Sequence, residues 1–408
     1  AYLQDLGQRL ATRSTAPELD YHFFILDIPS INAFAMPGGY IGVNAGLILA
    51  ARSESELAGV LAHEIAHVTQ RHLARRLESS QRVTLQNAAL LLAALLIGSQ
   101  DPQAGTAAAA ASVAGSIQQQ LNYSRAFEHE ADNLGIRMLA AADLDPHGMP
   151  AFFGRLAEAT RYQNRPPEYL STHPVTESRI SESSSRASSL GGGKIFESDT
   201  FRFMQYRLRV LKANPVRVED FETLTRHASR TEQPAARYGL ALAHAANRDY
   251  TKARSLLESL IDETGEQPSL LLALARLERD AGRLPRSFEL YEQVLALYPG
   301  NQPARLGYAE ALLQANDPNK AYWVLSRALP SSDASTYWLL AKAAAAAGRG
   351  NEPQLAMAEY YGLRGDYDAA LLQLQQVLNN PAASPHDTAR ASARREQLQR
   401  ERERLLRQ

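Results

Sequence analysis

Residues 63–67 read His63-Glu64-Ile65-Ala66-His67, within a run over residues 55–75 that we predict to be one continuous helix. On a helix, residues four apart share a face, so both imidazoles can reach one metal ion. Glu64 then lies beside a metal-bound water, whose proton a carboxylate can accept. The alternative is a chance pattern, because two histidines and a glutamate at this spacing do occur in unrelated helices.

The composition is that of an ordinary globular protein. At 408 residues the chain is long enough for two domains, with 45% hydrophobic and 21% charged residues. A net charge of -1 gives no electrostatic reason to expect nucleic acid or an acidic membrane surface as the main partner. The chain has no cysteine, so a zinc ion would have to be held by histidine and carboxylate side chains.

The beginning of the chain and one apolar region bear on location. The sequence opens at Ala1 without a methionine or a basic leader, so we expect a mature or truncated chain. The apolar run 88–97 is too short to span a bilayer, which takes roughly 20 residues. With 107–114 it predicts a helical hairpin packed on the catalytic core; the alternative is a tip that enters a membrane interface or covers the active site. At most peripheral membrane contact is expected.

The first part of the chain mixes strands and helices. Strands are predicted over residues 21–26, 33–36 and 40–43, and Pro37-Gly38-Gly39 between the last two is typical of a β-hairpin. We expect the strand near residues 39–44 to be an edge strand that takes up extended substrate by β-augmentation.

A serine- and glycine-rich stretch over residues 181–194 has the composition of a flexible linker. We therefore predict a first domain over 1–182, a linker over 183–200 and a second domain over 201–408. In the second domain, Gln-Pro recurs at 233–234, 267–268 and 302–303, spacings of 34 and 35 residues. That period predicts tetratricopeptide-like helical repeats, although any array of helical hairpins would look similar.

A third metal ligand must come from outside the His63–His67 motif. A catalytic zinc normally has three protein ligands and one open position. Position 73 is Leu, which disfavours the peptidase class with a third histidine there, and we expect His72 to be a surface histidine or one that supports a ligand from behind. Glu128 and Asp132 lie four apart on a predicted helix, so Glu128 could complete the site and Asp132 support it. The alternative is a solvated acidic patch.

The combination of these motifs resembles the zinc metallopeptidase family of HtpX and the CAAX prenyl proteases. The resemblance covers residues 1–180 and rests on the His63–His67 motif, the Glu128/Asp132 pair and Thr172-His173-Pro174 with Arg179. It implies a mostly helical α+β fold: a zincin-like metallopeptidase domain with a small β-sheet, followed by the all-α repeat domain.

The resemblance also implies roles for individual residues. His63, His67 and Glu128 would hold one Zn²⁺ per chain, with Glu64 as general base and Asp132 as a catalytic or supporting acid. His173 and Arg179 are candidates for stabilising the oxyanion. His173 has a second possible role, since in the resting enzyme it could occupy the open coordination position and keep the protease silent.

With the repeats attached, the resemblance implies a zinc-dependent endopeptidase and chaperone-like quality-control factor of the bacterial periplasm. Its partners would be unfolded or stalled outer-membrane β-barrel proteins and, through the repeats, the β-barrel assembly machinery. The competing hypothesis is a tetratricopeptide binding or chaperone module whose protease domain is latent.

Overall fold

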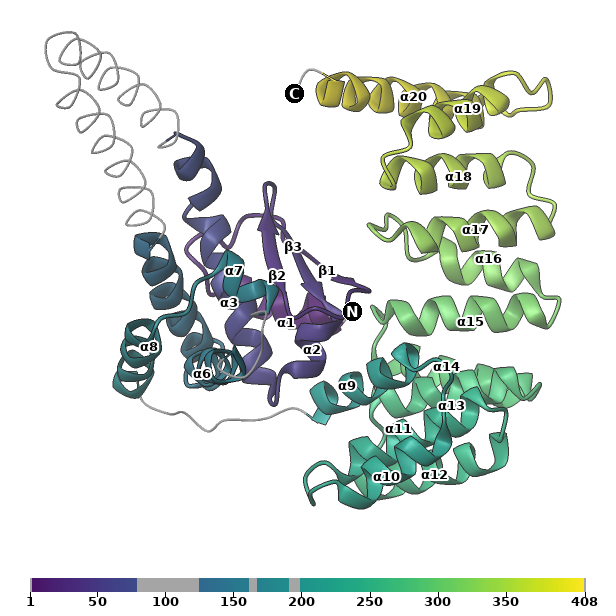
Figure 1. Ribbon diagram of the computed structural model, residues 1–408. Coiled ribbons are helices and arrows are strands. Elements are labelled where there is room, and N and C mark those ends of the chain that lie inside the picture. The colour runs from purple at the N-terminus through teal and green to yellow at the C-terminus, as the bar shows by residue number, and fades with distance from the viewer. Residues whose placement is uncertain (1, 79–124, 161–166, 191–198, 407–408) are drawn as a thin grey trace, which may run out of the picture. The chain divides into compact units, whose positions relative to one another are not determined.

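The computed structural model describes residues 2–78, 125–160, 167–190 and 199–406 (Figure 1). The chain divides into two compact units, Ala1–Lys212 and Ala213–Gln408. Both are dominated by helices, and the first also contains a three-stranded sheet. In the part of the chain that is described, no helix combines the length and the apolar character needed to cross a bilayer. The predicted hairpin over 88–114 lies outside the described residues.

The sheet of the first unit has the strand order β1-β3-β2. β1 (His22–Leu26) runs parallel to β3 (Tyr40–Asn44), and β2 (Ala33–Met36) runs antiparallel to it. Gly38 and Gly39 have φ values of 85° and 84°, which lets them form the tight connection between β2 and β3. The β-hairpin predicted around Pro37-Gly38-Gly39 is therefore confirmed.

The expectation that the strand near residues 39–44 is an edge strand is wrong. β3 is paired on both sides, and β1 and β2 are the two edges of the sheet in the part of the chain that is described. The cause is the parallel pairing of β1 with β3, which depends on a crossover and leaves no local signal in the sequence.

Helices surround the helix that carries the His63–His67 motif, α3 (Glu54–Thr69). Ser53 caps its first turn by accepting a hydrogen bond from the Glu56 amide, and the helix is buried from Glu54 to Ala66. α1 (Tyr2–Ala11) and β2 pack against it, and α2 (Ala45–Ala50) precedes it. This burial makes α3 the core helix of the unit.

The predicted continuous helix over 55–75 is interrupted. α3 ends at Thr69, Arg71 has a φ of 53°, and a new helical stretch begins at residue 72. A left-handed residue ends a helix, and that position is usually a glycine. An arginine there gives no sequence signal, so the break could not be predicted.

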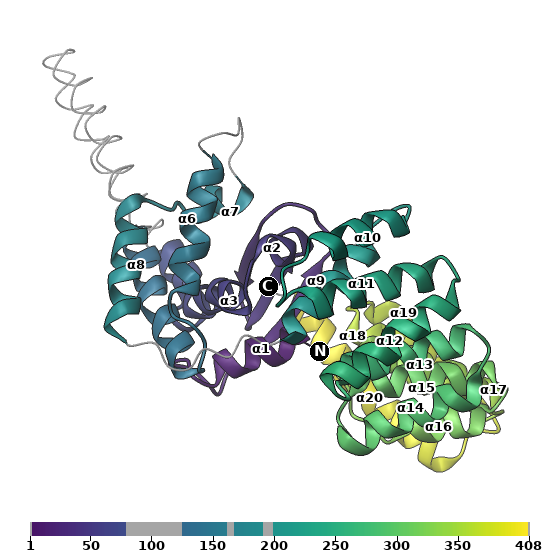
Figure 2. The ribbon, with the colours of Figure 1, turned by 90° about the horizontal axis from the view of Figure 1, so that it is seen from below.

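The remaining helices of the first unit follow residues 79–124, which lie outside the described part of the chain. They are a helix over residues 125–141, α6 (Gly148–Thr160), α7 (Glu168–Thr172), α8 (Glu177–Ser189) and α9 (Asp199–Lys212). α6 packs beside α3, and α8 packs on α6 (Figures 1 and 2). The 125–141 helix approaches α3 closely, since a Cβ on Gly135 would lie 3.3 Å from the His63 backbone nitrogen.

The boundary between the two compact units lies after Lys212, C-terminal to the predicted linker over 183–200. Residues 183–189 belong to α8, where Ala187 is buried in the core, and residues 191–198 lie outside the described part. In α9, Phe201 joins the core of the first unit and Gln205 donates hydrogen bonds to the carbonyls of Ile48 and Ala51. Serine-rich composition therefore did not prevent a helix here, because an apolar face anchors it.

The second unit is all-helical. Its helices are α10 (Val218–His227), α11 (Gln233–Ala246), α12 (Tyr250–Thr264), α13 (Pro268–Asp280), α14 (Leu284–Leu297), α15 (Gln302–Gln314), α16 (Pro318–Ser326), α17 (Ala334–Ala346), α18 (Glu352–Leu363), α19 (Tyr367–Leu378) and α20 (Pro385–Leu406). α11, α13 and α15 begin at the repeated Gln-Pro pairs, as predicted. Each packs against the helix after it (Figure 1).

Small residues permit the helix crossings of the repeats. A Cβ on Gly307 of α15 would lie 2.5 Å from the Tyr291 hydroxyl oxygen of α14. Ser287 is fully buried and donates a hydrogen bond to the Ala275 carbonyl. The 34-residue register of small residues thus corresponds to close contacts between consecutive helices.

Gly59→Ala tests the contact between α3 and α6. A Cβ at position 59 would lie 2.9 Å from Met149 Cα, and overpacking of this kind costs about 1–3 kcal/mol. We expect urea denaturation to show a loss of that size in the free energy of unfolding of the first unit. Gly154→Ala in α6 is the control, because no described atom lies within 4 Å of its Cβ position. Equal stability of both variants would contradict the close packing.

Candidate metal centre

Two histidines of α3 form one side of the site. His63 is fully buried, His67 is half-buried, and one helical turn separates them. Their Nε2 atoms lie 3.0 Å apart, so both rings direct the same nitrogen to one point. The predicted sharing of a helix face is confirmed.

The helix over residues 125–141 contributes Glu128 from the opposite side. Its Oε2 lies 3.4 Å from His63 Nε2, and its Oε1 lies 3.5 Å from His67 Nε2. The carboxylate is buried, which excludes the alternative of a solvated acidic patch.

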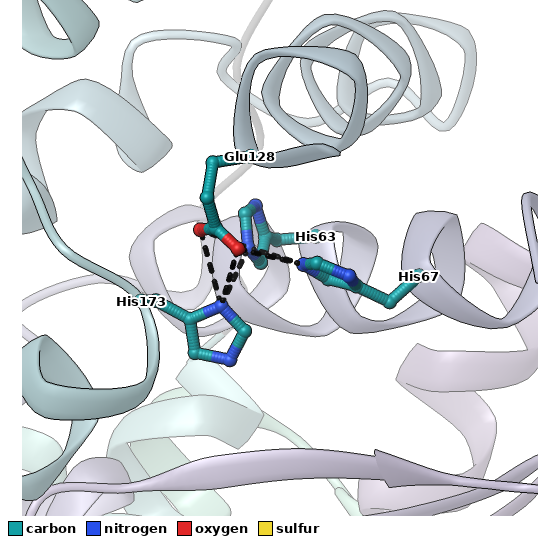
Figure 3. Close-up of side chains that lie close together, drawn as sticks. All are labelled: His63, His67, Glu128 and His173. Atoms are coloured by element: carbon teal, nitrogen blue, oxygen red, sulfur yellow. Dashed lines mark hydrogen bonds and ion pairs between the residues drawn. The ribbon is translucent and has the colours of Figure 1, made fainter. Parts of the chain in front are cut away.

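His173 completes the group from the end of α7. Its Nδ1 lies 3.2 Å from His63 Nε2 and 3.1 Å from Glu128 Oε2, as Figure 3 shows. Its other ring nitrogen, Nε2, faces Glu64 Oε1 at 3.5 Å. Residues from three separate segments therefore converge, and His173 supplies a fourth donor atom.

The spacing of these donors suits a tetrahedral metal ion. One donor atom from each of the four residues lies within 4.8 Å of all the others. The contacts given above run from 3.0 to 3.5 Å. A tetrahedral zinc with ligands at 2.0–2.1 Å separates its ligands by about 3.3 Å. The described residues thus fit a zinc ion.

Glu64 supplies a further sign of a polar ligand. The side chain is buried beside the four donors, yet none of the described groups donates a hydrogen bond to its Oε1. A buried carboxylate oxygen without a donor is costly. A water that enters the site beside Glu64 would provide the missing hydrogen bond.

Asp132 and Arg179 support the site from behind. Asp132 Oδ1 lies 2.9 Å from His63 Nδ1, so the carboxylate contacts the ring nitrogen that faces away from the centre. Arg179 donates to both oxygens of Asp132, at 2.7 and 2.8 Å, and its Nη1 lies 3.0 Å from Glu128 Oε2. The predicted supporting role of Asp132 is consistent with this direct contact between its carboxylate and the His63 ring.

The contacts of Arg179 do not favour the oxyanion role that we expected for it. The side chain is buried in α8, and besides the two carboxylates its Nη1 donates to the Pro174 carbonyl at 2.7 Å. The guanidinium is therefore held behind the ligands and positions Asp132 and Glu128.

The charge of Glu128 and the neutral state of His67 fit a cation site, whereas His63 must release a proton before it can bind a metal. Burial lowers the pKa of His67 well below its usual range. Burial would also lower the pKa of His63, but hydrogen bonds with Asp132 and Glu128 outweigh it and raise the pKa to about 9. Burial disfavours the Glu128 carboxylate, but His173 and His63 outweigh it and lower its pKa. The carboxylate is thus ionised at neutral pH, as a metal ligand must be.

His72 is a site residue whose contact the sequence did not reveal. It is buried, its Nδ1 lies 2.9 Å from His67 Nδ1, and its Nε2 lies 3.1 Å from Glu130 Oε2. Of the two roles that we expected, the supporting one matches these contacts. His129, in contrast, pairs with Glu182 at the surface and takes no part in the site.

A cavity of about 800 Å³ opens beside His67 and His173. The strand β2 and the connection after it line one side, and the helical stretch from residue 72 lines another. Several apolar side chains of this lining are exposed: Leu19, Met36, Leu73 and Leu77. The cavity therefore connects three of the four donors, His67, Glu128 and His173, to β2, an edge strand among the described strands.

Comparison with known proteins defines the class. Peptidase family M48 matches residues 1–187, and a tetratricopeptide repeat family matches residues 278–345. The mitochondrial metalloendopeptidase OMA1 of Schizosaccharomyces pombe is 27% identical over 44% of this chain and 50% of its own length. The fold and the site are thus those of a metalloprotease with helical repeats.

Longer relatives define the family. A Vibrio cholerae protein is 35% identical over 99% of this chain and 85% of its own length. The β-barrel assembly-enhancing protease of Escherichia coli is 33% identical over 99% of this chain and 84% of its own length. The chain belongs to the family of β-barrel assembly-enhancing proteases.

Arg179→Met tests the buried ion network. Removing one partner of a buried ion pair costs about 3–5 kcal/mol, because the remaining charge is left without compensation. We expect a loss of that size in the free energy of unfolding of the first unit, measured by urea denaturation. Arg186→Met on the same helix is the matched control and should change stability by less than about 0.5 kcal/mol. A similar loss in both variants would refute the special position of Arg179.

Proposed function

We propose that this chain is a zinc-dependent endopeptidase that acts on outer-membrane β-barrel proteins in the bacterial periplasm, promoting the assembly of productive forms and degrading defective ones. The observation that carries the catalytic part is the convergence of His63, His67 and Glu128 beside Glu64. The part that concerns β-barrel proteins rests on the name of the relative from Escherichia coli.

In this proposal His63, His67 and Glu128 hold the zinc, one ion per chain. When bound, the ion lowers the pKa of a water to about 7 and polarises the peptide carbonyl. Glu64 accepts the proton of the attacking water and returns it to the leaving amine. Its buried Oε1, which lacks a donor among the described groups, is available for this proton. The Asp132 carboxylate, with Oδ1 2.9 Å from Nδ1, keeps the His63 ring oriented.

His173 controls access to the fourth position. Its Nδ1 lies at the corner where water would have to bind, so the arrangement is that of a resting enzyme. The residue follows the five-residue helix α7 and precedes Pro174, and its ring stacks on Tyr169 with centroids 4.8 Å apart. Withdrawal of this ring would open the position to water and leave His173 near the substrate, where it can stabilise the oxyanion.

The substrate is an extended segment of an unfolded or stalled chain. Among the described strands β2 is an edge strand, and its residues line the cavity, so such a segment can add a strand to the sheet and cross the metal site. A completed barrel has no free strand edge, which makes it a poor substrate. Selection would follow conformation, with the exposed apolar side chains of the cavity favouring apolar residues.

The repeats of the second unit provide the means of binding partner proteins. Arrays of this kind present a long surface built from successive helices. We assign to it the binding of the β-barrel assembly machinery, and with it a chaperone-like function in the cell envelope. This assignment is supported by the tetratricopeptide match and by the name of the relative from Escherichia coli.

The second candidate function is a binding module with a latent protease domain. His173 in the fourth corner is the observation that favours latency. A site that had lost its activity would be expected to lose a donor or its base, whereas the four donors and Glu64 are all present and lie together. Regulated proteolysis explains both observations.

Glu64→Gln tests the catalytic base. Loss of a general base lowers the rate by about 10²–10⁴-fold, so casein cleavage should fall by that factor while zinc content stays near one ion per chain. Glu158→Gln on the exposed part of α6 is the matched control and should leave both unchanged. Removal of zinc with a chelator should abolish cleavage, and added zinc should restore it. Undiminished cleavage by Glu64→Gln would refute the mechanism.

His173→Ala tests the resting state. If the closed form dominates and the open form makes up 0.1–10% of molecules, removal of the ring should raise casein cleavage by about tenfold or more. His129→Ala, a surface histidine, is the control. Because the loss of the oxyanion contact would oppose this gain, the deciding measurement is the visible spectrum of the cobalt-substituted protein. A spectrum that does not change in His173→Ala would show that the ring does not occupy the fourth position.

A further inference from the structure

His72 is a buried histidine outside the group of four donors. Because it touches a proposed ligand and a carboxylate at once, it has more than a packing role. We propose that His72 and Glu130 form a hydrogen-bonded relay that holds the His67 ring in the orientation and tautomer required to bind zinc. The inference rests on the proposed zinc site and assigns His72 as a positioning residue.

The order of hydrogen bonds in the relay follows from its two ends. A carboxylate can only accept, so His72 Nε2, 3.1 Å from Glu130 Oε2, carries the hydrogen. The Nδ1 of a neutral His72 is then an acceptor, and it lies 2.9 Å from His67 Nδ1. His67 Nδ1 must therefore donate, which leaves the lone pair on Nε2, the nitrogen that faces the centre.

The other histidine of the motif supports this interpretation. His63 also directs Nε2 to the centre and places Nδ1 next to an acceptor, in this case the carboxylate of Asp132 at 2.9 Å. Histidines that bind metals commonly donate their second N–H to a carboxylate or carbonyl. No carboxylate contacts His67 Nδ1 among the residues described, and the imidazole of His72 fills that place.

The interruption after α3 brings His72 into position. In a continuous helix, residues 67 and 72 would differ by about 140° around the axis, and their rings would point apart. The left-handed conformation of Arg71 turns the chain, and the ring of His72 returns to that of His67, with centroids 4.8 Å apart. Arginine has no intrinsic preference for the left-handed conformation. The contact between His72 and His67 explains why the helix is interrupted at Arg71.

Further contacts hold the relay in place. The His72 ring stacks on Phe127, with centroids 4.3 Å apart and planes 17° from parallel. The guanidinium of Arg75 lies over the Phe127 ring, with its carbon 4.6 Å from the ring centroid. The same guanidinium donates a hydrogen bond to Glu130 at 3.0 Å. Phe127 directly precedes Glu128, so the same cluster connects the segment after α3 to the helix that carries the third proposed ligand.

The test is zinc affinity of the full-length protein. His72→Phe can keep the stacking on Phe127 but removes both hydrogen bonds, and we expect chelator competition to show zinc bound about 10–100-fold more weakly. The visible spectrum of the cobalt-substituted protein should change as well, because the His67 ring is no longer held. His129→Phe, on the surface of the 125–141 helix, is the matched control and should bind zinc as the wild type does.

Glu130→Leu tests the far end of the relay. It removes the acceptor that sets the His72 tautomer, so zinc affinity should fall, and the double variant His72→Phe/Glu130→Leu should be no weaker than His72→Phe alone. This variant also carries the test if His72→Phe does not fold, as judged by circular dichroism of the zinc-free protein.

Two results would overturn the inference. If wild type binds zinc tightly and His72→Phe binds it within about threefold, the relay is refuted and the proposed zinc site stands. Additive losses in the double variant would likewise refute a shared relay. If wild type binds no zinc, the proposed function fails together with the inference.

Discussion

The structure of the first unit depends on the burial of α3, a core helix that carries three ionisable side chains of the site. His63 and Glu64 are almost fully excluded from solvent. Buried polar and charged groups are tolerated when they are paired, and each unpaired one costs several kcal/mol. The arrangement of the surrounding helices can be understood as the provision of these partners: Asp132 for His63, Arg179 for two carboxylates, and His72 for His67.

This constraint links stability to catalysis. The side chains that compensate the buried charges are also the ones that orient the proposed ligands, so a change in the support should affect both folding and metal binding. Because the site is built from three separate segments, movement of one segment can change the site while the other two stay in place. His173 comes from the segment with the shortest helix, α7, and its ring takes the corner on which the reaction would depend.

Much of the fold followed from local patterns. Period-2 alternation around Pro37-Gly38-Gly39 predicted the β2–β3 hairpin, and the 34-residue period predicted the helical pairs of the second unit. The four-residue spacing of His63 and His67, and that of Glu128 and Asp132, predicted which side chains share a face. Features that depend on distant contacts were missed: the central position of β3, the break at Arg71 and the inclusion of α9 in the first unit.

The sequence by itself determined the kinds of ligand available, because a chain without cysteine offers histidine and carboxylate, and it determined which helices carry them. The tertiary structure decided which side chains contact each proposed ligand and hold it in place. Asp132 and Arg179 are 47 residues apart and His63 and His173 are 110 apart, and helical periodicity says nothing about such pairs. Hydrogen-bond partners across those separations are selected by the packing of whole helices, which depends on the shape and charge of all the surfaces that meet.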